Sequence, residues 1–286
     1  MAAGRSQGPL TCKTCPHACR LRPGEVGRCR ARGRLEGAIE AVSYGRLTAV
    51  ALDPVEKKPL ARWNPGKLLV SAGSYGCNLH CPFCQNHTIA QAGSDDVDWT
   101  FVPPGSLVDF AVREREKDPR VVGIAHTYNE PLVAWEYVCD VGLLARRVGL
   151  SNVLVSNGCV NEGVVSRVAP MVDAANIDLK GFTEEYYRWC GGDLATVRRC
   201  IELLAAQPGC HLEVTTLVVP GKNDEPDEMR RLASWLASVD PGIVLHVTRY
   251  FPRYRMARGN PTPLSTLQEL AEVARESLSD VLLGNC

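Results

Sequence analysis

Three cysteines spaced Cys-x3-Cys-x2-Cys follow a short apolar run in the first third of the chain. They are Cys77, Cys81 and Cys84, within residues 76–86. Thiolates are soft ligands that select zinc, copper(I) or an iron–sulfur cluster, and a cubane cluster ordinarily takes four cysteines. Three thiolates would leave one iron open to a ligand that is not protein. Chemistry can take place at that open position.

Two other interpretations of these cysteines are a zinc site and a chance group of buried thiols. Zinc would need a fourth ligand, and His80 or His87 is close enough in sequence to complete a Cys3His tetrahedron. Zinc hairpins usually pair two-residue spacings and rarely follow directly on a buried strand. The spacing therefore favours the iron–sulfur cluster.

At these residues the sequence resembles the radical S-adenosylmethionine (SAM) superfamily, which carries its cluster on such a loop between a strand and a helix. Together with residues 53–60 and 127–131, the loop is similar to AmmeMemoRadiSam-system enzymes, which are related to pyruvate formate-lyase activating enzymes. The resemblance extends from about Cys12 to Asn285. It implies a [4Fe–4S] cluster on the three cysteines and SAM on the open iron. Reductive cleavage would give a 5′-deoxyadenosyl radical that abstracts hydrogen from a substrate.

The resemblance also assigns six residues to the SAM pocket: Glu130, Asn157, Asp178, Lys180, His246 and Arg249. Glu130 stands where the superfamily has a carboxylate against the SAM amino group, although Tyr128 and Asn129 replace the usual glycines. Asn157 matches a residue near the ribose. Asp178 and Lys180 match an Asp-Leu-Lys element on the pocket floor. His246 and Arg249 are expected to contact the SAM carboxylate or the substrate.

A second group of cysteines lies near the start of the chain: Cys12, Cys15, Cys19 and Cys29. The stretch shows no helical or strand periodicity, and it is too short and polar to bury a core of its own. A metal would stabilise it, either zinc or a second iron–sulfur cluster. Loosely ordered thiols are the alternative. Five other cysteines are predicted to be small buried side chains: Cys139, Cys159, Cys190, Cys200 and Cys210.

The composition, 45% hydrophobic and 22% charged residues, is that of an ordinary globular chain. We predict two units, a cysteine-rich lobe over residues 1–65 and the main domain over 66–286. The chain shows neither an apolar run long enough to span a membrane nor a signal peptide, so we expect a cytoplasmic enzyme. The net charge of zero argues against nucleic-acid binding, although residues 1–34 carry seven arginines and one lysine against one glutamate.

Beyond Pro65, short apolar runs alternate with amphipathic stretches, which indicates parallel strands joined by helices. Strands are expected at 68–72, 121–125, 153–155, 172–177, 211–218, 243–247 and 281–283. Helices are expected at 105–117, 132–148, 162–168, 184–207, 226–238 and 264–277, the fourth broken at Gly191-Gly192. We therefore predict an α/β fold, a partial (β/α)6-type TIM-like barrel with a small N-terminal cysteine-rich lobe.

Two further stretches complete the prediction. Residues 35–50 alternate enough to form a hairpin that turns near Tyr44-Gly45. Residues 53–65 are rich in proline, and the run Glu56-Lys57-Lys58 alone would indicate a solvated loop; the family resemblance makes it an ordered loop over the site. In such barrels chemistry occurs on loops at the carboxyl ends of the strands, where the assigned residues are expected to converge.

The leading hypothesis is a radical SAM enzyme acting on a peptide or protein, since the related activating enzymes modify a polypeptide. Glycyl-radical activation and residue modification both fit. The expected partners are a one-electron reductant protein and companion proteins of the same system. A zinc-stapled module that binds nucleic acid or protein is one alternative, and steep salt dependence would reveal it. A barrel that only transfers electrons is the other, and reductant-dependent production of 5′-deoxyadenosine would exclude it.

Overall fold

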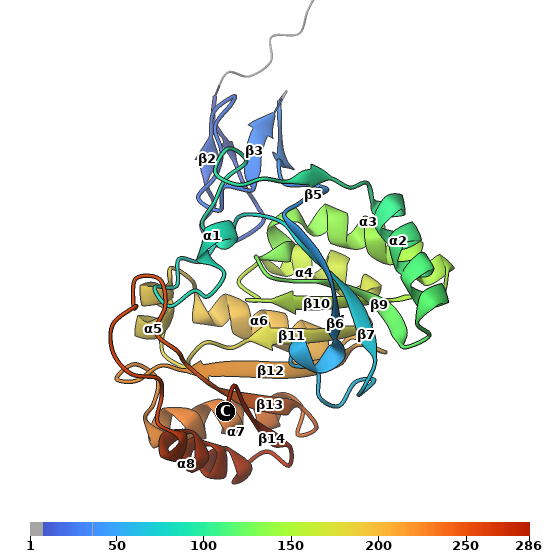
Figure 1. The fold of residues 1–286 in the computed structure, drawn as a ribbon. Helices are drawn as coiled ribbons and strands as arrows, with labels where there is room; N and C mark the ends of the chain where they lie inside the picture. The colour runs from blue at the N-terminus through green and yellow to red at the C-terminus, as the bar shows by residue number, and fades with distance from the viewer. Residues whose placement is uncertain (1–7, 36) are drawn as a thin grey trace, which may run out of the picture.

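One eight-stranded sheet organises the computed structural model, which describes residues 8–35 and 37–286. Its strands are β6 (Ala49–Pro54), β7 (Leu68–Gly73), β9 (Val121–His126), β10 (Ser151–Ser156), β11 (Ala174–Asp178), β12 (His211–Val218), β13 (Val244–Arg249) and β14 (Val281–Gly284). The order across the sheet is β14-β13-β12-β11-β10-β9-β7-β6 (Figure 1). All neighbours are parallel except β6 and β7. The two edge strands do not pair with each other in the described chain, so the barrel is partial, as predicted.

Helices follow the strands in the predicted alternation. They are α2 (Pro104–Lys117), α3 (Trp135–Arg147), α4 (Glu162–Val168), α5 (Glu184–Cys190), α6 (Leu194–Ala205), α7 (Pro226–Val239) and α8 (Leu264–Arg275). The alternation was readable because strands covered by helices are buried on both faces and form continuous apolar runs. None of these helices, nor any other in the described residues, has the length and apolar character to cross a bilayer.

The predicted break in the helix over 184–207 is confirmed. The helix α5 ends at Cys190, and the next residue, Gly191, has φ of 76°, the left-handed conformation that glycine adopts without strain. The helix α6 then starts after Asp193, whose carboxylate accepts a hydrogen bond from the backbone N–H of Thr196 at 2.7 Å.

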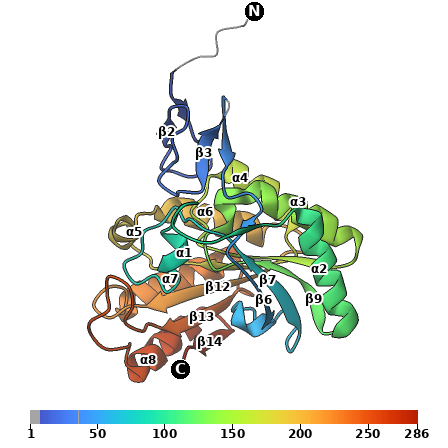
Figure 2. The same ribbon diagram turned by 45° about the horizontal axis from the view of Figure 1, so that its top comes forward.

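The N-terminal lobe consists of two small ribbons that project above the barrel (Figure 2). One pairs β1 (Leu10–Thr11) with β2 (Arg20–Leu21), and the other pairs β3 (Arg32–Leu35) with β4 (Ala38–Ala41). The predicted hairpin over 35–50 is therefore wrong, because the chain has already formed a hairpin between β3 and β4. The strand β6 instead leaves the lobe and pairs with β7, a partner that local alternation could not reveal. The main sheet thus contains strands from both sides of the predicted domain boundary at residue 65. The division into two domains stays a prediction.

Residues 55–62, here called the plug, fill the lower half of the barrel, which is the half at the amino-terminal ends of the strands. Val55 and Leu60 are fully buried and belong to one apolar cluster with Leu69, Val153 and Ala174, which lie in the amino-terminal halves of their strands. The expectation of a loop over the site is therefore wrong. The two apolar side chains bring the segment beneath the site, where they replace water in the barrel interior.

A buried ion pair connects the plug to the strands around it. Lys58 is 2% exposed, and its ammonium lies 2.7 Å from the Asp53 carboxylate, which Lys57 also contacts at 2.7 Å. Burial lowers the pKa of Lys58, and hydrogen bonds from its partners hold the pKa of Asp53 below its usual value despite burial. The Glu-Lys-Lys run is thus not a solvated loop, since one of its lysines neutralises a buried carboxylate.

Candidate active site

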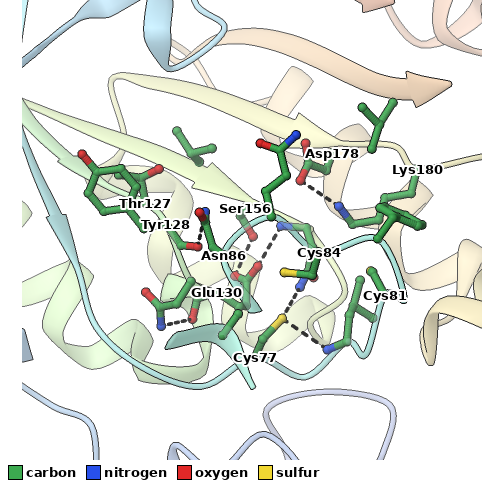
Figure 3. A pocket seen from close by; sticks show the side chains of 18 of the residues that line it. Cys77, Cys81, Cys84, Asn86, Thr127, Tyr128, Glu130, Ser156, Asp178 and Lys180 are labelled. Atoms are coloured by element: carbon green, nitrogen blue, oxygen red, sulfur yellow. Dashed lines mark hydrogen bonds and ion pairs between the residues drawn. The ribbon is translucent and has the colours of Figure 1, made fainter. Parts of the chain in front are cut away.

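A cavity of about 270 Å³ lies at the carboxyl ends of the strands (Figure 3). Seven of the residues assigned from the sequence line it: Cys77, Cys81, Cys84, Glu130, Asn157, Asp178 and Lys180. They come from the loops after β7, β9 and β10 and from the end of β11 and the residues just after it. Parallel strands bring their carboxyl ends to one edge of the sheet, so residues far apart in sequence meet there.

The cysteine loop begins at a close contact with the N-terminal lobe. Gly76 has φ of 86°, and a Cβ on it would lie 2.5 Å from the carbonyl oxygen of Cys29. The same oxygen accepts a hydrogen bond from the backbone N–H of Cys77 at 3.1 Å. Only glycine leaves room for this contact, which fixes the start of the loop and hence the position of the first cysteine.

The Cys77 thiol has two hydrogen-bond donors, the Leu79 backbone N–H at 3.4 Å and the Asn157 Nδ2 at 3.5 Å. Such donors favour a thiolate. Burial still raises the pKa of Cys77 well above its usual value and that of Cys84 to about 11. These two side chains are therefore neutral thiols in the metal-free protein, and a metal would have to displace their protons.

Cys190, the last residue of α5, reaches the second cysteine of the loop. A hydrogen bond from its thiol lowers the pKa of Cys81 in spite of burial, and the charge of Lys180 acts in the same direction. The backbone carbonyl of Cys190 also accepts the N–H of His80 at 2.7 Å. The prediction that this residue is buried is confirmed. Its contact with the loop was missed, since no sequence spacing relates the two.

Glu130 is 1% exposed, and three donors orient its carboxylate. They are the Leu132 N–H at 2.9 Å, the Ser156 hydroxyl at 2.7 Å and the Asn157 N–H at 2.7 Å. Burial outweighs these hydrogen bonds and raises the pKa of Glu130 to about 7. A cation bound beside it would restore the charged form, because opposite charge favours ionisation.

Asp178 and Lys180 form an ion pair at 2.9 Å on the cavity wall. Burial acts to lower the pKa of Lys180, but the charges of Asp178 and Cys81 outweigh it and raise that pKa well above the usual value. Lys180 is therefore a fixed cation next to the cysteine loop. It can compensate negative charge on thiolates or on a bound carboxylate.

The loop after β9 connects the cavity to three other segments, although it lacks the glycines usual in the superfamily. Tyr128 has φ of 73°, and its hydroxyl donates to Asp53 at 2.5 Å. The Asn129 side chain accepts the Ser74 N–H at 3.0 Å and donates to the Gly76 carbonyl at 3.1 Å. Both residues thus position the cysteine loop and the cavity wall, a role that the motif alone did not reveal.

His246 and Arg249 do not line the cavity, and their assignment to SAM or the substrate stays a prediction. The His246 Nε2 lies 2.5 Å from the Glu213 carboxylate. Two residues later on the same strand, Thr248 does line the cavity, so His246 faces the interior one layer lower. Arg249 donates through Nε to a backbone carbonyl in the loop after β13.

The two histidines that could complete a zinc site at the cysteine loop both form hydrogen bonds through Nδ1, an arrangement that is compatible with a metal ligand at Nε2. The Nδ1 of His80 lies 2.5 Å from the Gln91 side chain, and that of His87 lies 3.2 Å from the Cys84 carbonyl. Over residues 8–35 and 37–286, no three His, Cys, Asp or Glu side chains converge as ligands of a single ion. The same holds for the N-terminal cysteines, three of which are buried in the lobe, so a metal there stays a prediction.

Comparison with known proteins defines the class. The radical SAM superfamily matches residues 72–233, more than half of the chain, and the chain belongs to this superfamily. An uncharacterized protein of Methanocaldococcus jannaschii is 35% identical over 278 residues, which cover 96% of this chain and 81% of that protein.

Three solved structures are similar in fold. A domain of a pyruvate-formate lyase-activating enzyme from Bacteroides vulgatus has a TM-score of 0.50 at 16% identity and covers 57% of this chain and 99% of that one. Streptococcus suis SuiB bound to S-adenosylmethionine has a TM-score of 0.56 at 14% identity, covering 74% and 48%. A radical SAM methyltransferase from Sphaerobacter thermophilus has a TM-score of 0.54 at 16% identity, covering 77% and 66%.

Superfamily membership confirms an enzyme with a [4Fe–4S] cluster and SAM as cofactors, rather than a zinc-stapled binding module. The fold neighbours confirm the partial barrel. The narrower resemblance to AmmeMemoRadiSam-system enzymes, and the residues that hold each cofactor, stay predictions.

Proposed function

We propose that Cys77, Cys81 and Cys84 would hold the [4Fe–4S] cluster and that SAM would bind in the cavity beside it. The observation that carries this proposal is that the three thiols of the motif line one cavity. Four of the six polar residues assigned to SAM line the same cavity. When bound and reduced, the cluster supplies the electron that cleaves SAM and produces the 5′-deoxyadenosyl radical. The chain's own residues bind, orient and shield the reactants.

Glu130 would hold the SAM ammonium. Its carboxylate is oriented by three neutral donors and has no cation among them, which is why burial raises its pKa to about 7. An ammonium at this position would supply the missing charge and a charge-assisted hydrogen bond. Water is excluded from the carboxylate, so the interaction is stronger than it would be in solution.

Lys180 and Asn157 would serve the cluster as well as SAM. The Lys180 ammonium is a fixed positive charge, because the negative charges of Asp178 and Cys81 raise its pKa in spite of burial. The Asn157 amide donates to the Cys77 sulfur at 3.5 Å. The resemblance places Asn157 near the ribose, and the structure adds this contact with a cluster ligand. Donors and positive charge beside the sulfurs stabilise the more negative, reduced cluster.

We propose a peptide or protein as the substrate, either for glycyl-radical activation or for modification of a residue. Support comes from fold neighbours by analogy. One was solved as SuiB bound to its precursor peptide SuiA, and another is a pyruvate-formate lyase-activating enzyme. A one-electron reductant protein and companion proteins of the same system are the further partners of this proposal.

Anaerobic reconstitution tests the proposal. Wild-type protein should contain four irons and four sulfides per cluster, and it should release 5′-deoxyadenosine only when both SAM and reductant are present. Cys81→Ala should lose the cluster and the reaction, while Cys139→Ala, a cysteine on α3 away from the cavity, should keep both. Wild-type protein that binds only zinc at the cysteine loop, or a cluster that never cleaves SAM, would overturn the assignment.

A further inference from the structure

A loop rich in arginine lies against the outer side of the cysteine loop. It spans residues 250–263 and joins β13 to α8 (Figure 1). The backbone N–H of Arg255 donates to the carbonyl of Pro82 at 3.0 Å. The ring of Tyr254 stacks on His87, with centroids 4.4 Å apart. The proline directly follows the second cysteine of the motif, so this loop touches the backbone that would hold the cluster.

The tip of the loop is an ordered turn. The N–H of Arg253 donates to the carbonyl of Met256 at 3.1 Å, and the hydroxyl of the buried Tyr250 donates to the same carbonyl at 2.7 Å. Tyr254, between the two arginines of the turn, has φ of 55°. A surface that is already ordered loses little conformational entropy when a partner binds.

Three arginines on this loop are exposed: Arg253, Arg255 and Arg258, here called the arginine rim. Residues 241–268 contain four arginines and no aspartate, glutamate or lysine, and residues 68–94 contain no charged residue except histidine. Lys222 adds a cation nearby, since its ammonium lies 4.8 Å from the ring of Trp189, which packs on Phe83 of the cysteine loop at 5.6 Å. The arginine rim and Lys222 therefore bring positive side chains to a cysteine loop that has no carboxylate of its own.

We propose that the arginine rim docks a small acidic one-electron carrier protein that reduces the cluster. This inference rests on the proposed function, which places the cluster on the loop that the rim contacts. Electron transfer slows steeply with distance, so the carrier has to bind beside that loop. It loses one electron, the cluster gains it, and the same electron is consumed when the carbon–sulfur bond of SAM breaks. Complementary charge would steer the encounter.

The position of the rim favours a reductant over a substrate. A substrate has to place its reacting hydrogen inside the cavity, and none of the three rim arginines lines the cavity. The rim is instead connected to the backbone on the outer side of the cysteine loop, through Arg255 and Pro82. An electron needs no open passage, whereas a hydrogen atom has to meet the radical directly.

The test compares two charge-reversal variants of the reconstituted enzyme. Arg253→Glu/Arg258→Glu alters the rim, and Arg113→Glu/Arg147→Glu makes the same change in charge on exposed positions of α2 and α3. The probe is a flavodoxin with negative net charge. Its dissociation constant is measured at low and high salt, its rate of cluster reduction by stopped-flow absorbance, and 5′-deoxyadenosine release is measured with dithionite as a small reductant.

The rim variant should bind the flavodoxin at least about tenfold more weakly at low salt and lose most of the salt dependence, whereas the control variant should stay within about twofold of wild type. Dithionite should support equal 5′-deoxyadenosine release in all three proteins. Unchanged flavodoxin affinity in the rim variant would overturn the inference, as would weaker binding of a peptide substrate in its place. Failure of the proposed function is distinct, because wild type would then release no 5′-deoxyadenosine with dithionite.

Discussion

Two buried glutamates, one at the cavity and one beside the plug, have pKa values shifted in opposite directions. Glu130 at the cavity and Glu213 beside the plug are both almost completely buried. Burial raises the pKa of Glu130 to about 7. The pKa of Glu213 is lowered to about 2, because hydrogen bonds from two histidines and two backbone N–H groups outweigh burial. Four donors therefore stabilise the charged form of Glu213, whereas burial disfavours the charged form of Glu130.

This difference separates structural residues from functional ones. The Glu213 carboxylate accepts from Ala61, Arg62, His211 and His246, all within 3.0 Å, and none of these partners lines the cavity. Glu130 accepts only from neutral donors. A buried acid with an unfavourable charged form costs stability, and a protein retains it where a ligand supplies the missing charge.

The largest effect is expected from Glu213→Gln. An amide cannot accept from all four donors, so the free energy of unfolding at pH 7 should fall by about 3 kcal/mol. The affinity for SAM should not change under conditions where the variant is folded. Urea unfolding and calorimetric titration of SAM measure the two quantities. Glu269→Gln, an exposed position on α8, is the matched control and should change neither.

The pH dependence of stability sharpens the same prediction. The pKa of Glu213 in the folded protein is about 2, below the value of about 4.3 in an unfolded chain. Its contribution is therefore complete above about pH 4.3 and is lost as the pH falls toward 2. The difference in unfolding free energy between wild type and Glu213→Gln should shrink over that range. A constant difference down to pH 2 would contradict the assignment.

Glu130→Gln, in contrast to Glu213→Gln, should weaken the binding of SAM. We expect SAM affinity to fall about 10- to 100-fold, the equivalent of one or two charge-assisted hydrogen bonds. In wild type, affinity should also decline as the pH drops below about 7, because protonation removes the charge that attracts the ammonium. The variant should show no such decline. Glu228→Gln, which alters a buried glutamate away from the cavity, should leave SAM affinity unchanged.

Tyr128→Phe should have the smallest effect, and it tests whether the two ends of the barrel, at the cavity and at the plug, are independent. The Tyr128 side chain lines the cavity, and its hydroxyl donates to Asp53 in the network beside the plug. Loss of one hydrogen bond to an ionised carboxylate should cost about 1.5 kcal/mol of unfolding free energy. SAM affinity should change by less than about threefold.

Tyr137→Phe is the control for this variant, since it also loses one hydroxyl donor, the one to the Val102 carbonyl, at a position outside the cavity. Similar stability losses with unchanged SAM affinity in both variants would mean that the ends act separately. A large loss of SAM affinity in Tyr128→Phe alone would show that the plug network positions the cavity wall.

The sequence by itself indicated the class of chemistry, because the Cys-x3-Cys-x2-Cys motif is local and its resemblance to the radical SAM superfamily can be seen without the fold. It also determined the order of strands and helices and the break at Gly191, since apolar periodicity and glycine conformation are properties of short segments. The polar residues at four strand ends could also be assigned to one edge of the sheet, because parallel strands share a direction.

Only the tertiary structure decided which residues face the cavity and which are buried below it. His246 and Thr248 are two residues apart on one strand, yet one contacts Glu213 and the other lines the cavity. The pairing of β6 with β7, the plug inside the barrel and the contact of Arg255 with Pro82 join segments distant in sequence. Such contacts depend on how side chains fill a shared interior, which no local pattern encodes.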